Sequence, residues 1–304
     1  MTPKSIDISP FRRLYPFESH FLALRGMRLH YLDQGAGEPV LMVHGNPTWS
    51  FYFRGLIQRL SEKYRAIAPD HFGCGLSDVP SEDSYDYRLH SRVQDLEALI
   101  DALKLEQKLT LILHDWGGMI GMAFALRRPE RIGRIILTNT AAFPPPDNKP
   151  IPWRLKLIRN FPFWATPAVL KFNLFARAAL IMAPAKRLSS EVRAGLIAPY
   201  NSPRNRLATL KFVQDIPLAP SDPSYPLLKS VDADLHRLSA IPMMICWAMK
   251  DFVFDADYLT QWRLRFPKAR VHVFPNAGHY LLEDEPEAVG SHVMDFLNQN
   301  PLTP

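Results

Sequence analysis

The most constraining feature of this chain is an apolar run that ends in a glycine-rich turn with an aspartate at its tip. Residues 109–112 (Leu-Thr-Leu-Ile) are typical of a buried strand, and residues 113–118 (Leu-His-Asp-Trp-Gly-Gly) follow directly, before a helical stretch. A sharp strand–turn–helix of this kind lifts one side chain, here Asp115, above the edge of a parallel sheet. Aspartate in this place is also a good helix N-cap, because its oxygen accepts unpaired backbone N–H groups. The motif by itself leaves both interpretations open.

The chemistry of a carboxylate narrows the reactions that Asp115 could perform as a nucleophile. Attack on a carbonyl would give a reactive mixed anhydride, whereas displacement at a saturated carbon gives an alkyl-enzyme ester. The sequence therefore favours substitution at a saturated carbon over the acyl transfer of esterases, lipases and peptidases.

Further motifs follow other predicted strands. His44-Gly45-Asn46-Pro47 comes after the strand-like residues 39–43, where an oxyanion loop is expected, and we interpret the glycine-rich residues 69–78 as a structural turn. Residues 243–247 lead to Asp251, and residues 271–274 lead to His279. The order Asp115, Asp251, His279 is the chain order of an α/β-hydrolase triad of nucleophile, acid and base.

These motifs together resemble the haloalkane dehalogenases, over about residues 15 to 300. The resemblance implies Asp115 as nucleophile, His279 as base and Asp251 as the acid that orients it. It also implies that Asn46 and Trp116 hold the leaving group. Neutral N–H donors suit a soft anion and avoid a competing ion pair with the nucleophile. The alternatives are a core aromatic for Trp116 and a turn residue for Asn46.

The position of the acid is predicted by elimination among strand ends. The strand at residues 134–137 ends in Thr-Asn-Thr, without a carboxylate, which favours Asp251. The neighbouring acids are interpreted as charge clusters at helix N-termini: Asp255, Asp257, Glu283, Asp284 and Glu285. We therefore expect His279 to bond Asp251, and Asn46 and Trp116 to point N–H groups at one spot beside Asp115.

The expected fold is α/β, an α/β-hydrolase with a mostly parallel twisted sheet, helices on both faces and an inserted α-helical cap. The 304 residues, 47% of them hydrophobic, suffice for a large core. A hairpin is expected within residues 20–34, followed by alternating strands and helices. We assign residues 1–145 and 227–304 to the core and residues 146–226, which have no strand-like runs, to the cap.

The cap segment is rich in apolar and aromatic residues punctuated by Lys and Arg, as in residues 151–182. Packing on the core accounts for most such residues on general grounds. A basic, aromatic amphipathic surface also suits contact with a membrane or admission of a long alkyl chain. Both interpretations stay open, and peripheral membrane contact through the cap is one of our expectations.

Composition limits the other partners. Cys74 and Cys246 lie in separate motif regions without metal-ligand spacing, so we expect a reducing compartment and no disulfide. We also expect no metal and no cofactor. The first residues lack the apolar region of a signal peptide, and no apolar run is long enough for a membrane span. The net charge of +6 is mild and unclustered, which argues against nucleic acid. A cytoplasmic location, with membrane association left open, is expected.

Beyond the site motifs, residues 44–54, 70–78, 198–206 and 212–218 are similar to the β-lactone decarboxylases of bacterial long-chain olefin biosynthesis. That resemblance implies a long-chain hydrophobic substrate, a cis-3,4-dialkyl-oxetan-2-one, converted to a cis-alkene and carbon dioxide. It also implies association with other olefin-biosynthesis enzymes. Asp115 would open the strained ring, with Asn46 and Trp116 holding the departing carboxylate. His279 would then orient Asp115 or assist the collapse, rather than activate water.

Three alternatives remain beside this leading hypothesis. A haloalkane dehalogenase would release halide and an alcohol. An epoxide hydrolase needs acidic cap groups, and Tyr200 and Tyr225 are the only tyrosines in the cap segment. A binding protein without catalysis is disfavoured because the triad is complete.

Overall fold

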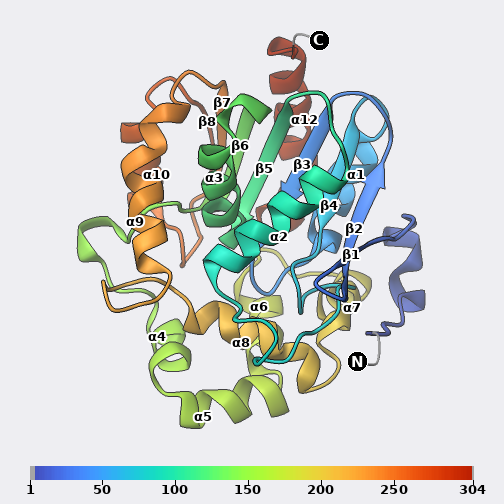
Figure 1. Cartoon of the computed structure of the whole chain (residues 1–304), viewed down its shortest axis with the longest axis vertical. Coiled ribbons are helices and arrows are strands. Elements are labelled where there is room, and N and C mark those ends of the chain that lie inside the picture. Colours follow the sequence, from blue (N-terminus) through green and yellow to red (C-terminus); the bar gives the residue numbers. More distant parts are fainter. Residues whose placement is uncertain (1–3, 303–304) are drawn as a thin grey trace.

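An eight-stranded sheet with helices on both faces forms the centre of the protein (Figure 1). The computed structural model describes residues 4–302. The strand order is β1-β2-β4-β3-β5-β6-β7-β8. The strands are His20–Leu24 (β1), Met27–Gln34 (β2), Pro39–Val43 (β3), Arg65–Pro69 (β4), Leu109–Asp115 (β5), Ile132–Thr140 (β6), Met243–Ala248 (β7) and Arg270–Phe274 (β8).

Strand pairing confirms the predicted fold class. β1 and β2 form the expected antiparallel hairpin, and β2 also pairs antiparallel with β4. All other neighbouring strands are parallel. Every residue of β5 is buried, with Leu111 and Leu113 in the core on one face and Ile112 in the core on the other. A central parallel strand is covered on both faces, which is why its sequence is continuously apolar.

The helices divide between the two faces of the sheet. Side chains of α2, α3, α9 and α10 build one core, and those of α1 and α12 build the other (Figure 1). The helices of these layers are Arg54–Leu60 (α1), Leu89–Ala102 (α2), Trp116–Arg127 (α3), Tyr225–Asp234 (α9), Ala256–Arg265 (α10), Leu281–Asp284 (α11) and Pro286–Gln299 (α12).

The chain between β6 and β7 holds a group of helices at the carboxyl ends of the parallel strands (Figure 1). No strand occurs there within the described chain. The helices are Trp153–Asn160 (α4), Pro162–Thr166 (α5), Leu174–Met182 (α6), Ser190–Ile197 (α7) and Leu207–Gln214 (α8), and a π-helical segment spans Pro167–Lys171. α9 begins at Tyr225, near the end of the segment assigned to the cap, and buries Leu228 and Val231 in the core.

None of the helices in residues 4–302 is by itself long and apolar enough to cross a membrane. One pair, Pro162–Lys171 with Leu174–Met182, reaches the required length and composition only together, and the two parts meet at a bend of 76°.

Candidate active site

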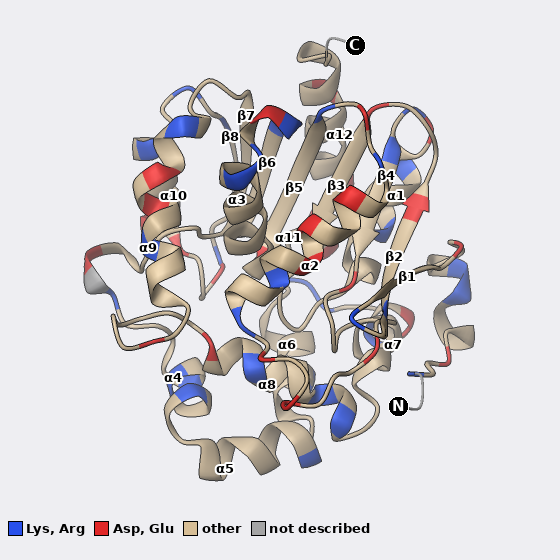
Figure 2. Cartoon of the chain, viewed as in Figure 1, with Lys and Arg blue, Asp and Glu red and all other residues tan. Residues whose placement is uncertain are grey.

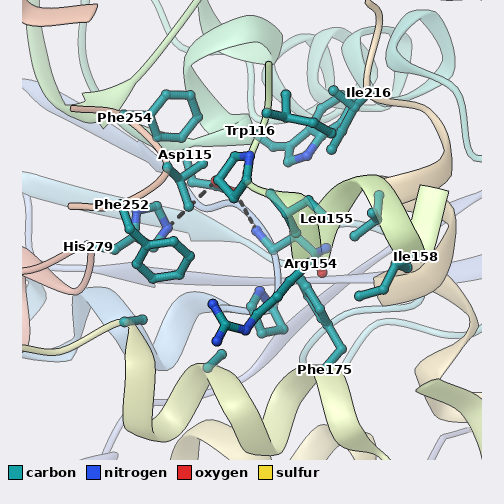
Figure 3. Close-up of a pocket in the computed structure, with 18 of the residues that line it drawn as sticks. Asp115, Trp116, Arg154, Leu155, Ile158, Phe175, Ile216, Phe252, Phe254 and His279 are labelled. Atoms are coloured by element: carbon teal, nitrogen blue, oxygen red, sulfur yellow. Dashed lines mark hydrogen bonds and ion pairs between the residues drawn. The ribbon is translucent and has the colours of Figure 1, made fainter. Parts of the chain in front are cut away.

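The structure brings the residues singled out by the sequence to one edge of the sheet. Asn46 follows β3, Asp115 ends β5, Asp251 follows β7 and His279 follows β8. Parallel strands end at the same edge, so residues distant in sequence meet there. Asn46, Asp115, Trp116 and His279 line a single cavity (Figure 3).

Asp115 occupies a sharp turn between β5 and α3. Its backbone has φ 52° and ψ −125°, a conformation that L-residues rarely adopt. Gly117 makes the turn feasible, because a Cβ there would overlap the carbonyl oxygen of Val43. The hydroxyl of Thr140 donates to the Asp115 carbonyl oxygen and links the turn to β6. The predicted elbow geometry is therefore confirmed.

The carboxylate of Asp115 is buried and held by neutral donors on one side. The backbone N–H of Asn46 donates to Oδ1 over 2.6 Å, and Gly45 leaves room because a Cβ there would overlap this carboxylate. Burial raises the pKa of Asp115 above its usual value, while His279 and the backbone N–H groups of Trp116 and Asn46 oppose that rise. The carboxylate is thus less hydrated than an exposed one, which strengthens it as a nucleophile once it is ionised.

His279 joins the two carboxylates of the site. Its Nδ1 lies 2.8 Å from Asp251 Oδ2, and its Nε2 lies 3.6 Å from Asp115 Oδ2 (Figure 3). The other oxygen of Asp251 accepts the backbone N–H groups of Val253 and Phe254, over 2.7 and 3.1 Å. Burial lowers the pKa of His279, but Asp251 and then Asp115 raise it by more, so the net shift is upward. The predicted bond between His279 and Asp251 is confirmed.

The neighbouring acids have other partners, as expected. Asp255 and Asp257 both pair with Lys149, and Asp255 also caps α10 by accepting the N–H of Asp257 over 3.1 Å. Glu283 forms a two-bond ion pair with Arg54, over 2.6 and 2.7 Å. None of these three carboxylates reaches His279.

Asn46 and Trp116 lie beside Asp115, as the leaving-group hypothesis requires. Asn46 Nδ2 donates one bond to the carbonyl oxygen of Thr209 in α8 over 3.0 Å, which leaves its second hydrogen available. The Trp116 indole N–H has no hydrogen-bond acceptor among the described residues. Its ring packs on Phe212 of α8, with the two ring centroids 5.2 Å apart. Two neutral donors thus remain at this end of the cavity, and their convergence on an anion stays a prediction.

Two residues that hold the site in place were not identified from the sequence. The first is Asn139, at the end of β6. Its Nδ2 donates to the carbonyl oxygens of Ala248 and Phe254, and its Oδ1 accepts the N–H of Ala248. These bonds fix both ends of the loop that carries Asp251. The sequence indicated only that no carboxylate stands at this position.

The second is Asp284, which we had interpreted as a helix-terminal charge. Its buried carboxylate accepts the N–H of Gly278 over 2.7 Å, next to His279, and those of Ala185 and Lys186 over 2.8 and 2.9 Å. The interpretation was incomplete, because Asp284 ties the loop of His279 to the chain that leaves α6. Only the long-range contacts identify this role.

Above the catalytic end the cavity is mostly apolar and extends between the cap helices, with Arg154 of α4 also in its wall (Figure 3). Its volume is about 600 Å³, and α4, α5 and α6 contribute much of its wall. Figure 3 shows Leu155, Ile158 and Phe175 on this side, away from Asp115 and His279. Tyr200 and Tyr225 do not line it, and the Tyr200 hydroxyl donates instead to the carbonyl oxygen of Thr48 over 3.3 Å. The acid groups that an epoxide hydrolase needs are therefore not supplied by these two tyrosines.

Metal ligands are not grouped at this site or elsewhere in residues 4–302. No set of three or more His, Cys, Asp or Glu side chains there is arranged to hold a metal ion.

Comparisons with known proteins agree with this fold. A model of the α/β-hydrolase fold family matches residues 38–286. The cis-3-alkyl-4-alkyloxetan-2-one decarboxylase of Shewanella oneidensis is 47% identical, over 94% of this chain and 90% of its own. Haloalkane dehalogenase 2 of Mycobacterium bovis is 33% identical, over 96% and 99%. The crystal structure of haloalkane dehalogenase DbeA from Bradyrhizobium elkani has a TM-score of 0.85 at 25% identity, over 93% of this chain and 98% of its own.

Proposed function

The chain belongs to the α/β-hydrolase fold family, and we propose that it is a decarboxylase of cis-3-alkyl-4-alkyloxetan-2-ones that releases an alkene and carbon dioxide. The observation that carries the substrate class is the 47% identity to the Shewanella oneidensis decarboxylase over nearly the whole chain. The site supports the chemistry, since a buried carboxylate nucleophile lies at the end of an apolar cavity. Such a reaction would belong to the biosynthesis of long-chain olefins.

In the first step Asp115 attacks the ring carbon that bears the ring oxygen. A bond forms between Asp115 and this carbon, the carbon–oxygen bond of the ring breaks, and the ring oxygen leaves as part of a carboxylate. Asn46 and Trp116 stabilise that carboxylate with neutral N–H groups. The product of this step is an alkyl-enzyme ester.

In the second step the new carboxylate leaves as carbon dioxide. The electrons of its carbon–carbon bond form the double bond, and Asp115 departs as a carboxylate, so no water is consumed. In the first step, attack by Asp115 inverts the configuration at the ring carbon that bears the ring oxygen. Loss of the two groups from opposite faces then gives the same cis-alkene that direct loss from one face would give.

His279 has a defined task in this sequence. Asp251 accepts a hydrogen bond from Nδ1 and so keeps one proton on that nitrogen. In the doubly protonated ring the second proton is on Nε2, which faces Asp115. The raised pKa of His279 favours this protonated form. The imidazolium stabilises the carboxylate of Asp115 as it is expelled, which assists the second step.

The apolar cavity supports a substrate with long alkyl chains. Each methylene group moved from water to such a lining contributes about 0.8 kcal/mol to binding. A dialkyl lactone also lacks charges that would need partners in the cavity. Long chains are therefore expected to bind more tightly than short ones.

Haloalkane hydrolysis is the second candidate, because the 33% identical relative from Mycobacterium bovis bears the name of a dehalogenase. The same Asp115 would displace halide, and Asn46 and Trp116 would hold it. A neutral His279 would then activate water against the ester. The two reactions differ in the use of water and in the protonation state that His279 needs.

Product analysis separates the two candidates. The purified protein is incubated in ¹⁸O-labelled water with a long-chain cis-dialkyl β-lactone and, separately, with 1,2-dibromoethane. We expect cis-alkene and no ¹⁸O-labelled β-hydroxy acid from the lactone, and little halide from the dibromide. Halide and ¹⁸O-labelled alcohol from the dibromide, with no alkene from the lactone, would replace the lyase by the dehalogenase. The Asp115→Asn variant is the control for uncatalysed loss of carbon dioxide.

A further inference from the structure

The outer surface of the cap exposes large apolar side chains. Phe163 is 79% exposed and Trp164 is 73% exposed, both on α5. The set extends over α4, α5, α6 and the π-helical segment between them, and α5 lies at the end of the molecule farthest from the sheet (Figure 1). Its members, here called the cap face, are Trp153, Leu157, Phe161, Phe163, Trp164, Phe172, Leu174 and Ile181. Eight large apolar side chains exposed on consecutive segments of the cap indicate an interaction site.

The charged residues within the segment that carries the cap face are all basic. Residues 148–190 contain eight Lys or Arg residues and no Asp or Glu. Three of the cations, Lys149, Arg159 and Lys186, pair with acids elsewhere in the chain. The remaining five form no ion pair within residues 4–302: Arg154, Lys156, Lys171, Arg177 and Arg187. Figure 2 shows α4 and the segment after α5 with basic but no acidic positions.

We propose that the cap face docks on the surface of an anionic lipid bilayer. Aromatic side chains favour the level of the lipid headgroups, and cations around them attract anionic lipid. One contact already has this character, since the Lys171 ammonium lies 5.6 Å from the centroid of the Phe172 ring. A segment whose charged residues are all basic is complementary to such a membrane.

The helices are built to lie on a bilayer and not to cross it. α5 with the π-helical segment and α6 meet at 76°, so together they do not form a straight span. Val169 and Leu180, on the inner sides of these helices, are buried in the protein. One side of the pair is therefore already packed, and only the outer side is left for lipid.

The cap face is continuous with the wall of the cavity. Four members of the cap face, Leu157, Phe161, Trp164 and Leu174, are exposed to solvent and also line the cavity. This step rests on the proposed function, in which the substrate is a dialkyl lactone. Such a lactone would dissolve in the bilayer and not in water. Docking would let such a molecule enter the cavity from lipid between apolar side chains.

Vesicle binding without substrate tests the docking. Sedimentation of the whole protein with phosphatidylcholine vesicles, with and without phosphatidylglycerol, measures the partition coefficient. We expect binding to the anionic vesicles that weakens with added salt. Fluorescence of Trp153 and Trp164 should shift to shorter wavelength and be quenched by brominated lipid. The other four tryptophans are buried and report no change.

Variants outside the cavity wall localise the contact. Phe163→Ser with Phe172→Ser should lower partitioning on the order of tenfold or more, since two exposed rings lose their burial in lipid. The matched control is Leu264→Ser, a 69% exposed position on α10, which should leave partitioning unchanged. Lys156→Gln and Arg177→Gln should each reduce binding about fivefold, on anionic vesicles only.

Three results would overturn the proposal. The first is that the wild-type protein does not bind anionic vesicles. The second is that Leu264→Ser lowers partitioning as much as Phe163→Ser with Phe172→Ser does. The third is that another protein, and not lipid, covers the cap face. Because no lactone is present, the outcome is independent of the catalytic proposal. A protein that docks but makes no alkene refutes the proposed function alone, and one that makes alkene but does not dock refutes the docking alone.

Discussion

Replacing Asp251 by Asn tests how His279 works. The carboxylate of Asp251 uses one oxygen for the N–H groups of Val253 and Phe254 and the other for His279 Nδ1. In Asp251→Asn the amide oxygen keeps the two backbone bonds, so the amide NH₂ faces Nδ1. His279 then becomes a neutral ring with its proton on Nε2, still directed at Asp115.

The size of the effect differs between the two reactions. For the lyase, His279 changes from a charged to a neutral donor, and the difference between such hydrogen bonds predicts a fall in kcat of about ten- to hundredfold. For a hydrolase, Nε2 can no longer take a proton from water, and loss of the correct tautomer costs on the order of 10⁴-fold. Magnitude alone therefore distinguishes the two roles.

The assay combines lactone turnover with a titration of His279 by NMR. Because Asp251 is the main group that raises the pKa of His279 against the effect of burial, we expect a lower pKa in the variant. As the pH is raised, any activity that needs the imidazolium should then be lost at a lower pH in the variant than in the native protein. Asp255→Asn is the matched control, since this acid pairs with Lys149. Unchanged turnover, or a loss near 10⁴-fold on the lactone, would refute the reasoning.

Three other changes give sharp expectations. Asp115→Asn should lower the rate of alkene formation by several orders of magnitude with little change in melting temperature. In the native protein, kcat/KM should fall as the pH drops through the raised pKa of Asp115, because only the ionised carboxylate attacks. Trp116→Phe keeps a ring but removes the indole N–H, so kcat should fall about hundred- to thousandfold with a smaller effect on KM, and an unchanged kcat would exclude this donor. Asp284→Asn leaves the N–H groups at Gly278 and the cap less well bonded and should cost about 1.5 to 3 kcal/mol in denaturant unfolding, whereas the exposed control Glu287→Gln should change stability by less than about 0.5 kcal/mol.

The sequence predicted the parts of this protein that depend on local pattern. The apolar run of β5, the turn at Asp115 and the glycine that follows identify the elbow, because a strand buried on both faces and a tight turn each restrict the residues that can occupy them. The order of Asp115, Asp251 and His279 at strand ends then predicted the triad, since parallel strands end at one edge. Because no carboxylate stands at the end of β6, the sequence predicted Asp251 as the acid that orients His279.

The sequence could not predict which polar residues support the site. Asn139 and Asp284 act through bonds to backbone groups that lie far away in sequence, and any short polar residue at a strand end or helix start would look the same. The partner of Asn46, the carbonyl oxygen of Thr209, belongs to the cap. Such contacts depend on how separate elements pack.

The cap shows the same division. Its sequence determined that the segment is helical, basic and rich in aromatic residues, because composition and helical spacing are local properties. Only the tertiary structure decided which apolar residues face inward, such as Val169 and Leu180, and which stay exposed, such as Phe163 and Trp164. An apolar side chain gains the same free energy from any dry surface. Its sequence position therefore cannot tell core, cavity and lipid apart, and only the packing of the helices does.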